Sequence, residues 1–262
     1  MSHVIAICHQ KGGVAKTTTS LGLGACWAEH GVETLLIDLD PQANLTCNLG
    51  LDPDSVELSA AEVMTKEAAA GRAAVETRLP GLDLIPSNAS MLNLSRRLYG
   101  TPKYEFLLRR ALEDPALRHY AAVLIDCPPS VGPLTINALT AADLLVIPTQ
   151  CEYYSIQALT DMFELVNVVR NRTNPTLAYR LLVTMFDGRG KFHAAMLEQL
   201  RDYFRNGILQ TTIGFDTKLR EAQAAGLPIT VHAPQSRAAG QYRQLAEELR
   251  SYVTEKPHVQ TA

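Results

Sequence analysis

The sequence has no run of 18 or more apolar residues and no charged segment leading into an apolar one at its N-terminus. A helix that spans a bilayer needs about 20 apolar residues, and a secretory leader needs a basic start. We therefore expect neither a membrane span nor a signal peptide, and a cytoplasmic protein. Internal repeats and low-complexity segments are also missing. Only residues 253–262 are expected to form a disordered tail.

Cysteine is scarce and shows no paired spacing. The five cysteines are Cys8, Cys26, Cys47, Cys127 and Cys151, and no two of them form a C-x-x-C pattern. An odd number of cysteines in a chain without a secretion signal excludes a disulfide framework. We expect free thiols in the core or in loops.

Charge is nearly balanced overall but unevenly distributed. The 262 residues are 47% hydrophobic and 19% charged, which predicts one large domain, residues 1–252, with a substantial core. The net charge is −3. Residues 1–179 hold 13 Lys and Arg against 19 Asp and Glu, whereas residues 180–250 hold 10 against 7. A basic region on an acidic chain points modestly to a polyanionic partner.

A glycine-rich loop near the N-terminus separates an expected strand from an expected helix. Residues 4–7 are apolar, and apolar positions recur at helical spacing over residues 20–28. The intervening loop reads His9-Gln10-Lys11-Gly12-Gly13-Val14-Ala15-Lys16-Thr17-Thr18-Thr19. Adjacent glycines turn backbone N–H groups toward an anion, and the helix N-terminus adds its positive dipole end. The loop therefore predicts a phosphate site, with Lys16 at the terminal phosphates and Thr17 as a Mg²⁺ ligand.

The loop departs from the common pattern G-x-x-x-x-G-K-[ST]. Gln10 and Ala15 stand where that pattern has its first and last glycines. The chain fits K-G-G-x-x-K-[ST] instead, with the extra lysine Lys11. If position 15 needs a positive φ, the Cβ of Ala15 costs on the order of 1 kcal/mol.

Two further expected strands end in carboxylates. Residues 33–38 lead into Asp38-Leu39-Asp40-Pro41-Gln42, and residues 121–126 end at Asp126 before two prolines. The carboxyl ends of parallel strands carry functional groups at one edge of a sheet. We therefore expect Asp40 and Asp126 beside the phosphate loop, with Asp126 holding a water of the Mg²⁺ shell.

Strands and helices alternate along the rest of the chain. Further strands are expected at 82–86, 143–150, 180–187 and 208–213, and helices at 57–70, 103–113, 155–170, 191–204, 216–225 and 236–252. The segment 87–102 is expected to be partly helical. Alternation of this kind implies right-handed crossovers. The fold class is α/β, a doubly wound and mostly parallel sheet flanked by helices in a single domain.

The loop pattern resembles the deviant Walker A motif of the ParA/MinD family of P-loop ATPases. Other stretches resemble motifs of its ParA/Soj branch: residues 38–44, 124–130, 148–154, 184–189, and 219–222 with 226–228. This resemblance covers residues 2–250 or so and implies ATP and Mg²⁺ as cofactors, slow ATP hydrolysis and an ATP-bound sandwich dimer.

The resemblance also implies roles for single residues. Lys11 is the signature lysine that reaches the partner subunit's phosphates, Lys16 binds the β- and γ-phosphates, and Asp40 orients the attacking water. Nucleotide contacts fall on Lys11, Gly12, Gly13, Val14, Ala15, Lys16, Thr17, Thr18 and, near the adenine, Pro228. Arg189 and Lys218, or alternatively Arg220, match positions of a non-specific DNA-binding surface, although as single residues they are equally well explained as solvated surface charges.

The function implied is that of a nucleoid-associated partitioning ATPase that binds duplex DNA and is switched by a ParB-like activator. One alternative is a ParA-like positioner of another cargo. A MinD-type membrane-cycling ATPase is disfavoured because residues 254–262 contain a proline and only one aliphatic residue larger than alanine, which does not make an amphipathic targeting helix. An iron–sulfur reductase is rejected because only Cys127 has a suitable context.

Overall fold

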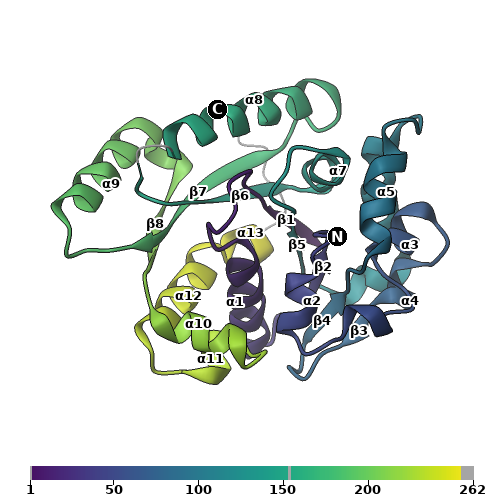
Figure 1. Ribbon diagram of the computed structural model, residues 1–262, viewed down its shortest axis with the longest axis horizontal. Helices are drawn as coiled ribbons and strands as arrows, with labels where there is room; N and C mark the ends of the chain where they lie inside the picture. The colour runs from purple at the N-terminus through teal and green to yellow at the C-terminus, as the bar shows by residue number, and fades with distance from the viewer. Residues whose placement is uncertain (1, 153–154, 255–262) are drawn as a thin grey trace.

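The computed structural model describes residues 2–152 and 155–254. An eight-stranded sheet forms its centre, with the strand order β3-β4-β2-β5-β1-β6-β7-β8 (Figure 1). The strands are β1 (His3–Ile7), β2 (Thr34–Asp38), β3 (Val75–Glu76), β4 (Leu82–Ile85), β5 (Ala122–Asp126), β6 (Leu144–Thr149), β7 (Ala178–Phe186) and β8 (Ile208–Gly214). All neighbouring pairs are parallel except β3 with β4. The expected doubly wound, mostly parallel fold is confirmed.

Helices cover both faces of the sheet, as Figure 1 shows. One face carries α3 (Ala60–Thr65), α4 (Ala70–Ala73), α5 (Ser90–Leu98), α6 (Leu107–Ala111), α7 (Pro133–Ala141), α8 (Ser155–Arg172) and α9 (Lys191–Phe204). The other carries α1 (Lys16–Glu29), α2 (Asn44–Asn48), α10 (Thr217–Ala224), α11 (Ile229–His232) and α12 (Arg237–Glu248). Short 3₁₀-helices occur at η1 (Pro53–Ser55), η2 (Tyr104–Phe106), η3 (Pro115–His119) and η4 (Arg205–Gly207). Burial of the central strands on both faces explains why they are almost entirely apolar.

Several helices differ from the sequence-based expectation. The helix expected at 57–70 begins only at Ala60, because Ser59 and Glu62 form a capping box, and it ends where Lys66 takes a left-handed φ of 64°. The helix expected at 103–113 is shorter and begins as the 3₁₀-helix η2. The helix expected at 236–252 is divided into α12 and α13 (Ser251–Thr254). Helix α7, helix α11 and strand β3 were not predicted.

Two glycines let α1 pack closely. A Cβ on Gly22 would lie 2.8 Å from the ring of Tyr242 in α12, and one on Gly24 would lie 2.9 Å from Leu36 in β2. Tyr242 is fully buried. The helix that follows the phosphate loop is therefore in close contact with both the sheet and α12.

No helix within the described residues is long and apolar enough to cross a bilayer. Residues 253 and 254 end α13, and the remainder of the expected tail lies outside the described residues.

Candidate functional site

The glycine-rich loop connects β1 to α1 and has an unusual backbone. Gly13 has a φ of 73° and Ala15 a φ of 68°, both in the left-handed region. No atom lies within 4 Å of a Cβ built on Gly12 or Gly13, so the backbone is open on that side. Lys16 is the first residue of α1, which directs the helix N-terminus at the loop. The geometry is that of an anion cradle.

The strain foreseen at Ala15 is present in the structure. We expect Ala15→Gly to stabilise the protein by about 0.5–1 kcal/mol, because glycine removes the left-handed penalty at the cost of a more flexible unfolded chain. The measurement is the free energy of unfolding in urea. Ala28→Gly, inside α1, is the matched control and should be destabilising by about 1 kcal/mol. A destabilising effect at position 15 would contradict the prediction.

Asp126 lies at the tip of β5, directly beside the loop. Its carboxylate accepts hydrogen bonds from the Thr17 hydroxyl (2.7 Å) and the Ser20 hydroxyl (3.0 Å). Strand register places it next to Ile7 and Asp38. Complete burial, together with the nearby Asp38 carboxylate, raises the pKa of Asp126. A carboxylate that is costly to ionise beside a hydroxyl is suited to a Mg²⁺ ion, whose charge would offset that cost.

We expect Asp126→Asn to stabilise the nucleotide-free, Mg²⁺-free protein at pH 8 by about 1 kcal/mol or more, since each pKa unit corresponds to about 1.4 kcal/mol. Because the folded-state pKa is raised, the folded protein binds the proton more tightly than the unfolded chain. Wild-type stability should therefore fall as the pH rises from about 4 through the raised pKa, and the variant should lose much of that dependence. Urea midpoints at pH 5.5 and pH 8 measure both effects. Lower stability of the variant at pH 8 would contradict the expectation.

Asp38 and Asp40 have different environments although they are two residues apart. Asp38 is fully buried and accepts hydrogen bonds from the backbone N–H (2.9 Å) and hydroxyl (2.8 Å) of Thr46 and from the N–H of Asp40 (3.0 Å). Asp40 lines the cavity, and its carboxylate accepts the N–H of Gln42 (2.9 Å). Asp38 thus folds the segment that presents Asp40.

The two lysines of the loop are close together. The Lys16 ammonium donates to the backbone carbonyl of Lys11 (3.3 Å). The Lys11 ammonium donates to the Gln150 side chain (3.1 Å) and forms an ion pair with Glu152. Gln150 also donates to the carbonyl of Gly13 (3.2 Å). The segment after β6 therefore holds Lys11 within its own subunit; Tyr153 and Tyr154 of the 148–154 motif lie outside the described residues.

His9 fixes the start of the loop. Its Nδ1 accepts the backbone N–H of Lys11 at 2.9 Å, and the ring is buried. Burial, reinforced by the charges of Lys16 and Lys11, lowers the pKa of His9 to about 4. The imidazole is neutral near pH 7, as an acceptor at Nδ1 requires.

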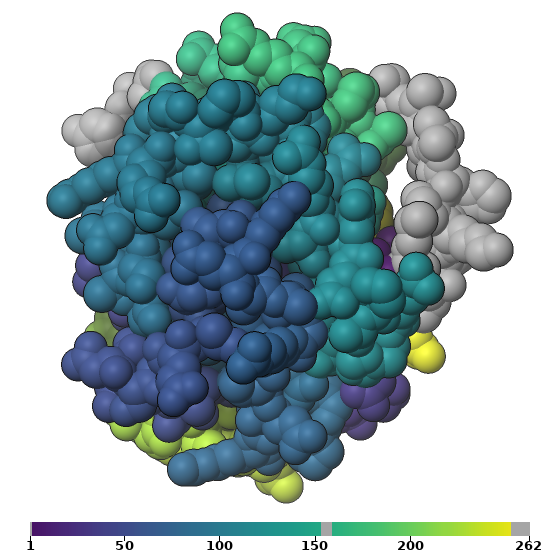
Figure 2. Space-filling view, turned by 90° about the vertical axis from the view of Figure 1, so that its right-hand side faces the viewer, coloured from purple at the N-terminus to yellow at the C-terminus, as the bar shows by residue number. Residues whose placement is uncertain are grey.

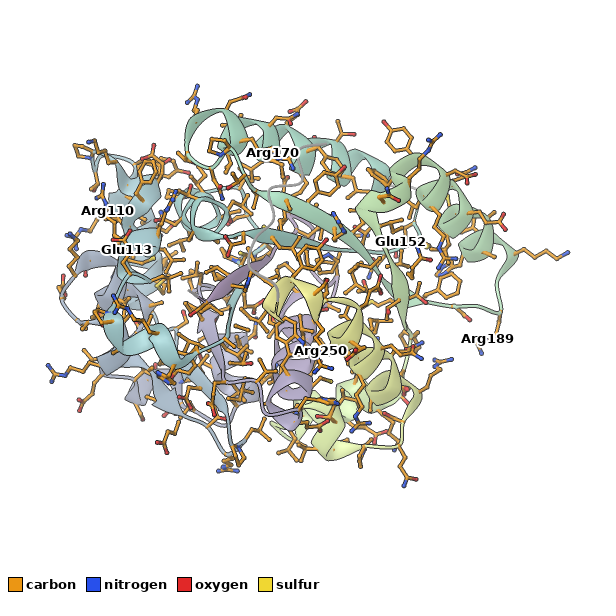
Figure 3. The ribbon with its side chains drawn as sticks, turned by 180° about the vertical axis from the view of Figure 1, so that it is seen from behind. Arg110, Glu113, Glu152, Arg170, Arg189 and Arg250 are labelled. Carbon is orange, nitrogen blue, oxygen red and sulfur yellow. The ribbon has the colours of Figure 1, made fainter. Side chains whose placement is uncertain are left out.

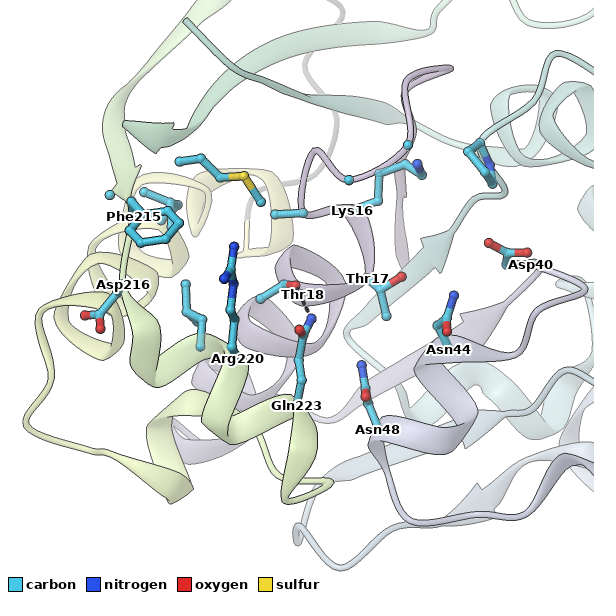
Figure 4. A pocket seen from close by; sticks show the side chains of 18 residues that line it. Lys16, Thr17, Thr18, Asp40, Asn44, Asn48, Phe215, Asp216, Arg220 and Gln223 are labelled. Atoms are coloured by element: carbon cyan, nitrogen blue, oxygen red, sulfur yellow. Dashed lines mark hydrogen bonds between the residues drawn. The ribbon is translucent and has the colours of Figure 1, made fainter. Parts of the chain in front are cut away.

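A cavity of about 410 Å³ opens in front of the loop (Figure 4). Its remote end is built from residues that the sequence gave no reason to connect: the Gln223 amide donates to the Thr18 hydroxyl (2.8 Å), and the Arg220 guanidinium lies 5.2 Å from the centre of the Phe215 ring. Asn44 and Asn48 of α2 line the same space. Pro228 lines a small adjoining pocket together with Thr18 and Gln223. A cavity with one cationic, glycine-rich end and one mixed apolar and amide end suits a nucleoside phosphate.

The remaining basic candidates lie elsewhere. Arg189 has 90% of its side chain exposed and pairs with Asp187 at 2.8 Å. Lys218 pairs with Glu221 at 2.7 Å. Arg220, the alternative to Lys218, lines the cavity instead. The loop and the carboxylates thus come together as expected, whereas Arg189 belongs to a separate part of the surface (Figure 3).

Comparisons with known proteins agree with this geometry. Residues 2–179 match a protein family described as an AAA domain. The chain is 40% identical over 250 residues to the sporulation initiation inhibitor protein Soj of Bacillus subtilis, covering 95% of this chain and 98% of Soj. It is 37% identical over 250 residues to the chromosome partitioning protein ParA of Caulobacter vibrioides, covering 94% and 93%.

Solved structures show the same architecture. A cobyrinic acid a,c-diamide synthase from Mycobacterium smegmatis, with bound ATP analog and magnesium, superposes with a TM-score of 0.84 at 32% identity over 100% of both chains. The ATP complex of a Cyanothece McdA variant superposes with a TM-score of 0.85 over 98% of this chain and 99% of its own, but at 21% identity it shows the fold alone.

Proposed function

The chain belongs to the ParA/Soj-type partitioning ATPases, and from this premise we propose that it binds and slowly hydrolyses ATP with Mg²⁺, dimerises in the ATP state and then binds duplex DNA without sequence preference. A ParB-like partner would accelerate hydrolysis and so release the DNA. One observation carries the proposal: the signature lysine, the phosphate-loop lysine and the strand-tip carboxylates surround one end of a single cavity.

The residues present fit ATP and Mg²⁺. The open backbone at Gly12 and Gly13 leaves room for phosphate oxygens, and Lys16 supplies a full positive charge beside them. The Thr17 hydroxyl and the Asp126 carboxylate are hard oxygen ligands, already 2.7 Å apart, that would hold the metal directly and through water. When bound, Mg²⁺ neutralises charge on the β- and γ-phosphates. The nucleobase end of the site would be formed by Asn44, Asn48, Arg220 and Gln223, with Pro228 adjoining.

Hydrolysis is assigned to two further groups. Asp40 faces the cavity from the segment after β2 and would orient the attacking water. Lys11 would leave Glu152 and Gln150 and donate across the dimer interface to the other subunit's phosphates, where it would stabilise developing negative charge. Because that step needs a second subunit, a lone protomer should turn over slowly.

The test combines two measurements on the whole protein. Light scattering should show a dimer with Mg²⁺ and a non-hydrolysable ATP analogue, and a monomer with ADP. Gel retention of random duplex DNA should follow the same nucleotide dependence. Arg189→Glu should weaken retention without changing the affinity for ATP, and Arg172→Glu, an exposed arginine on α8, is the charge-matched control. A protein that stays monomeric at saturating analogue would refute the proposal.

A further inference from the structure

Positive charge is concentrated in one segment that no motif draws attention to. Residues 94–112 contain Arg96, Arg97, Lys103, Arg109 and Arg110, against a single acidic residue, Glu105. The segment therefore carries a net charge of +4, although the whole chain carries −3. Such local segregation on an acidic protein is a physical signal for an anionic partner.

The fold turns these cations outward. Helices α5 and α6 bury Leu94, Leu98 and Leu108 in the core, and α5, η2 and α6 all pack against α7. The five basic side chains are left exposed. We call these five residues the basic corner. Figure 2 shows this stretch of the chain covering the upper part of one face of the molecule.

The basic corner differs from the other basic positions in how its charges are compensated. Arg189, Lys218, Arg243 and Arg250 each have a carboxylate partner. Within the described residues, none of the five cations of the basic corner forms an ion pair, and the one further contact is that of Arg110 with the Phe106 ring, 5.9 Å away. Their charge is therefore available to an external anion.

We propose that the basic corner binds the phosphate backbone of duplex DNA. Four of its five cations are arginines, whose planar donor forks suit phosphate oxygens. An acidic protein partner is disfavoured because a protein interface needs an apolar centre, and the large exposed side chain in this segment is the lone Tyr99, 69% exposed. Contacts of this kind carry affinity and position, and they carry no sequence preference.

The basic corner is separate from the surface that contains Arg189. Arg110 and Arg189 lie at opposite ends of the molecule in Figure 3. The inference deepens the proposed function, on which it rests, by adding a second DNA contact on each subunit. A dimer would then hold DNA through four regions, so the affinity should depend steeply on salt.

The experiment measures DNA affinity against salt concentration, with the full-length protein, Mg²⁺ and a non-hydrolysable ATP analogue. We compare the wild type with Arg97→Gln/Arg109→Gln and with the control Arg78→Gln/Arg172→Gln, which removes two exposed arginines outside the basic corner. Each lost phosphate contact reduces the slope of log K against log salt by about 0.9, so the corner variant should lose up to about 1.8 per subunit and bind on the order of tenfold more weakly per contact at 0.1 M salt. The control should match the wild type. Light scattering and urea unfolding of each variant verify that the dimer and the fold are retained.

The outcomes separate this inference from the proposed function. Equal affinity and equal slope for the wild type and the corner variant would overturn the basic corner as a DNA surface while the proposed function stands. No DNA binding by the wild-type dimer would overturn both. Tight binding of poly-L-glutamate that requires the corner arginines, with DNA affinity unaffected by their removal, would assign the surface to an acidic protein and overturn the inference.

Discussion

Replacing Asp40 by alanine should lower kcat for ATP hydrolysis by about 10²–10⁴-fold, the range expected when a positioned proton-accepting group is removed. ATP binding should change little, because the phosphate loop, Lys16 and Asp126 do not depend on this side chain. The Asp40 carboxylate accepts one hydrogen bond, from the N–H of Gln42, and its other oxygen is free to orient a water molecule. Single-turnover hydrolysis and equilibrium binding of a fluorescent ATP analogue measure the two effects separately.

Two comparisons make the Asp40 result specific. Asp52→Ala removes a carboxylate from the surface turn at η1 and should leave kcat unchanged. Asp38→Ala, in contrast, deletes the acceptor of three hydrogen bonds and should destabilise the fold. If Asp40→Ala abolished ATP binding as well, Asp40 would be a nucleotide ligand, and its assignment to the water would be wrong.

Replacing Lys11 by alanine should remove the ATP-dependent dimer and lower kcat by about 10³-fold or more, by analogy with a cationic finger supplied in trans. The affinity of the monomer for ATP should fall far less, because Lys16 remains. In the present arrangement Lys11 is bound by Gln150 and Glu152, so its charge is already compensated within the subunit. Light scattering with a non-hydrolysable analogue tests the dimer, and steady-state hydrolysis tests the rate.

The controls for Lys11 use the same contacts. Lys191→Ala removes an exposed lysine at the start of α9 and should change neither quantity. Glu152→Gln releases Lys11 without removing it and should lower the ATP concentration needed for dimerisation. Dimerisation of Lys11→Ala at wild-type analogue concentrations would exclude a cross-subunit role for Lys11.

Much of the fold and the phosphate end of the site could be predicted because the signals are local. Adjacent glycines, a lysine and a hydroxyl within one short loop specify a backbone shape, and apolar runs ending in aspartate specify the sheet edge. The positive φ of Ala15 also follows from the loop pattern. Local signals were overlooked at α7, where Pro133 occupies the first helical turn, and at Ser59 and Glu62, whose capping box marks the true start of α3.

The rest of the site depends on contacts between distant segments. Gln150 and Glu152 lie some 140 residues from Lys11 in sequence, and Gln223 lies 205 residues from Thr18. Hydrogen bonds of this kind leave no periodicity or spacing in the chain. Arg220 shows the same limit: its sequence neighbours suggest a surface cation, and only the packing of α10 reveals that it lies beside Phe215 in the cavity.

The contact between Gly22 and Tyr242 limits where the molecule can deform when a triphosphate enters. With the helix behind the phosphate loop in contact with an aromatic ring on one side and a β-strand side chain on the other, that helix cannot shift without a steric clash. Any rearrangement must then come from the connections after β2, β5 and β6, which approach the ligand from the opposite side. The C-terminal helix α12 serves as a rigid mount against which these three connections move.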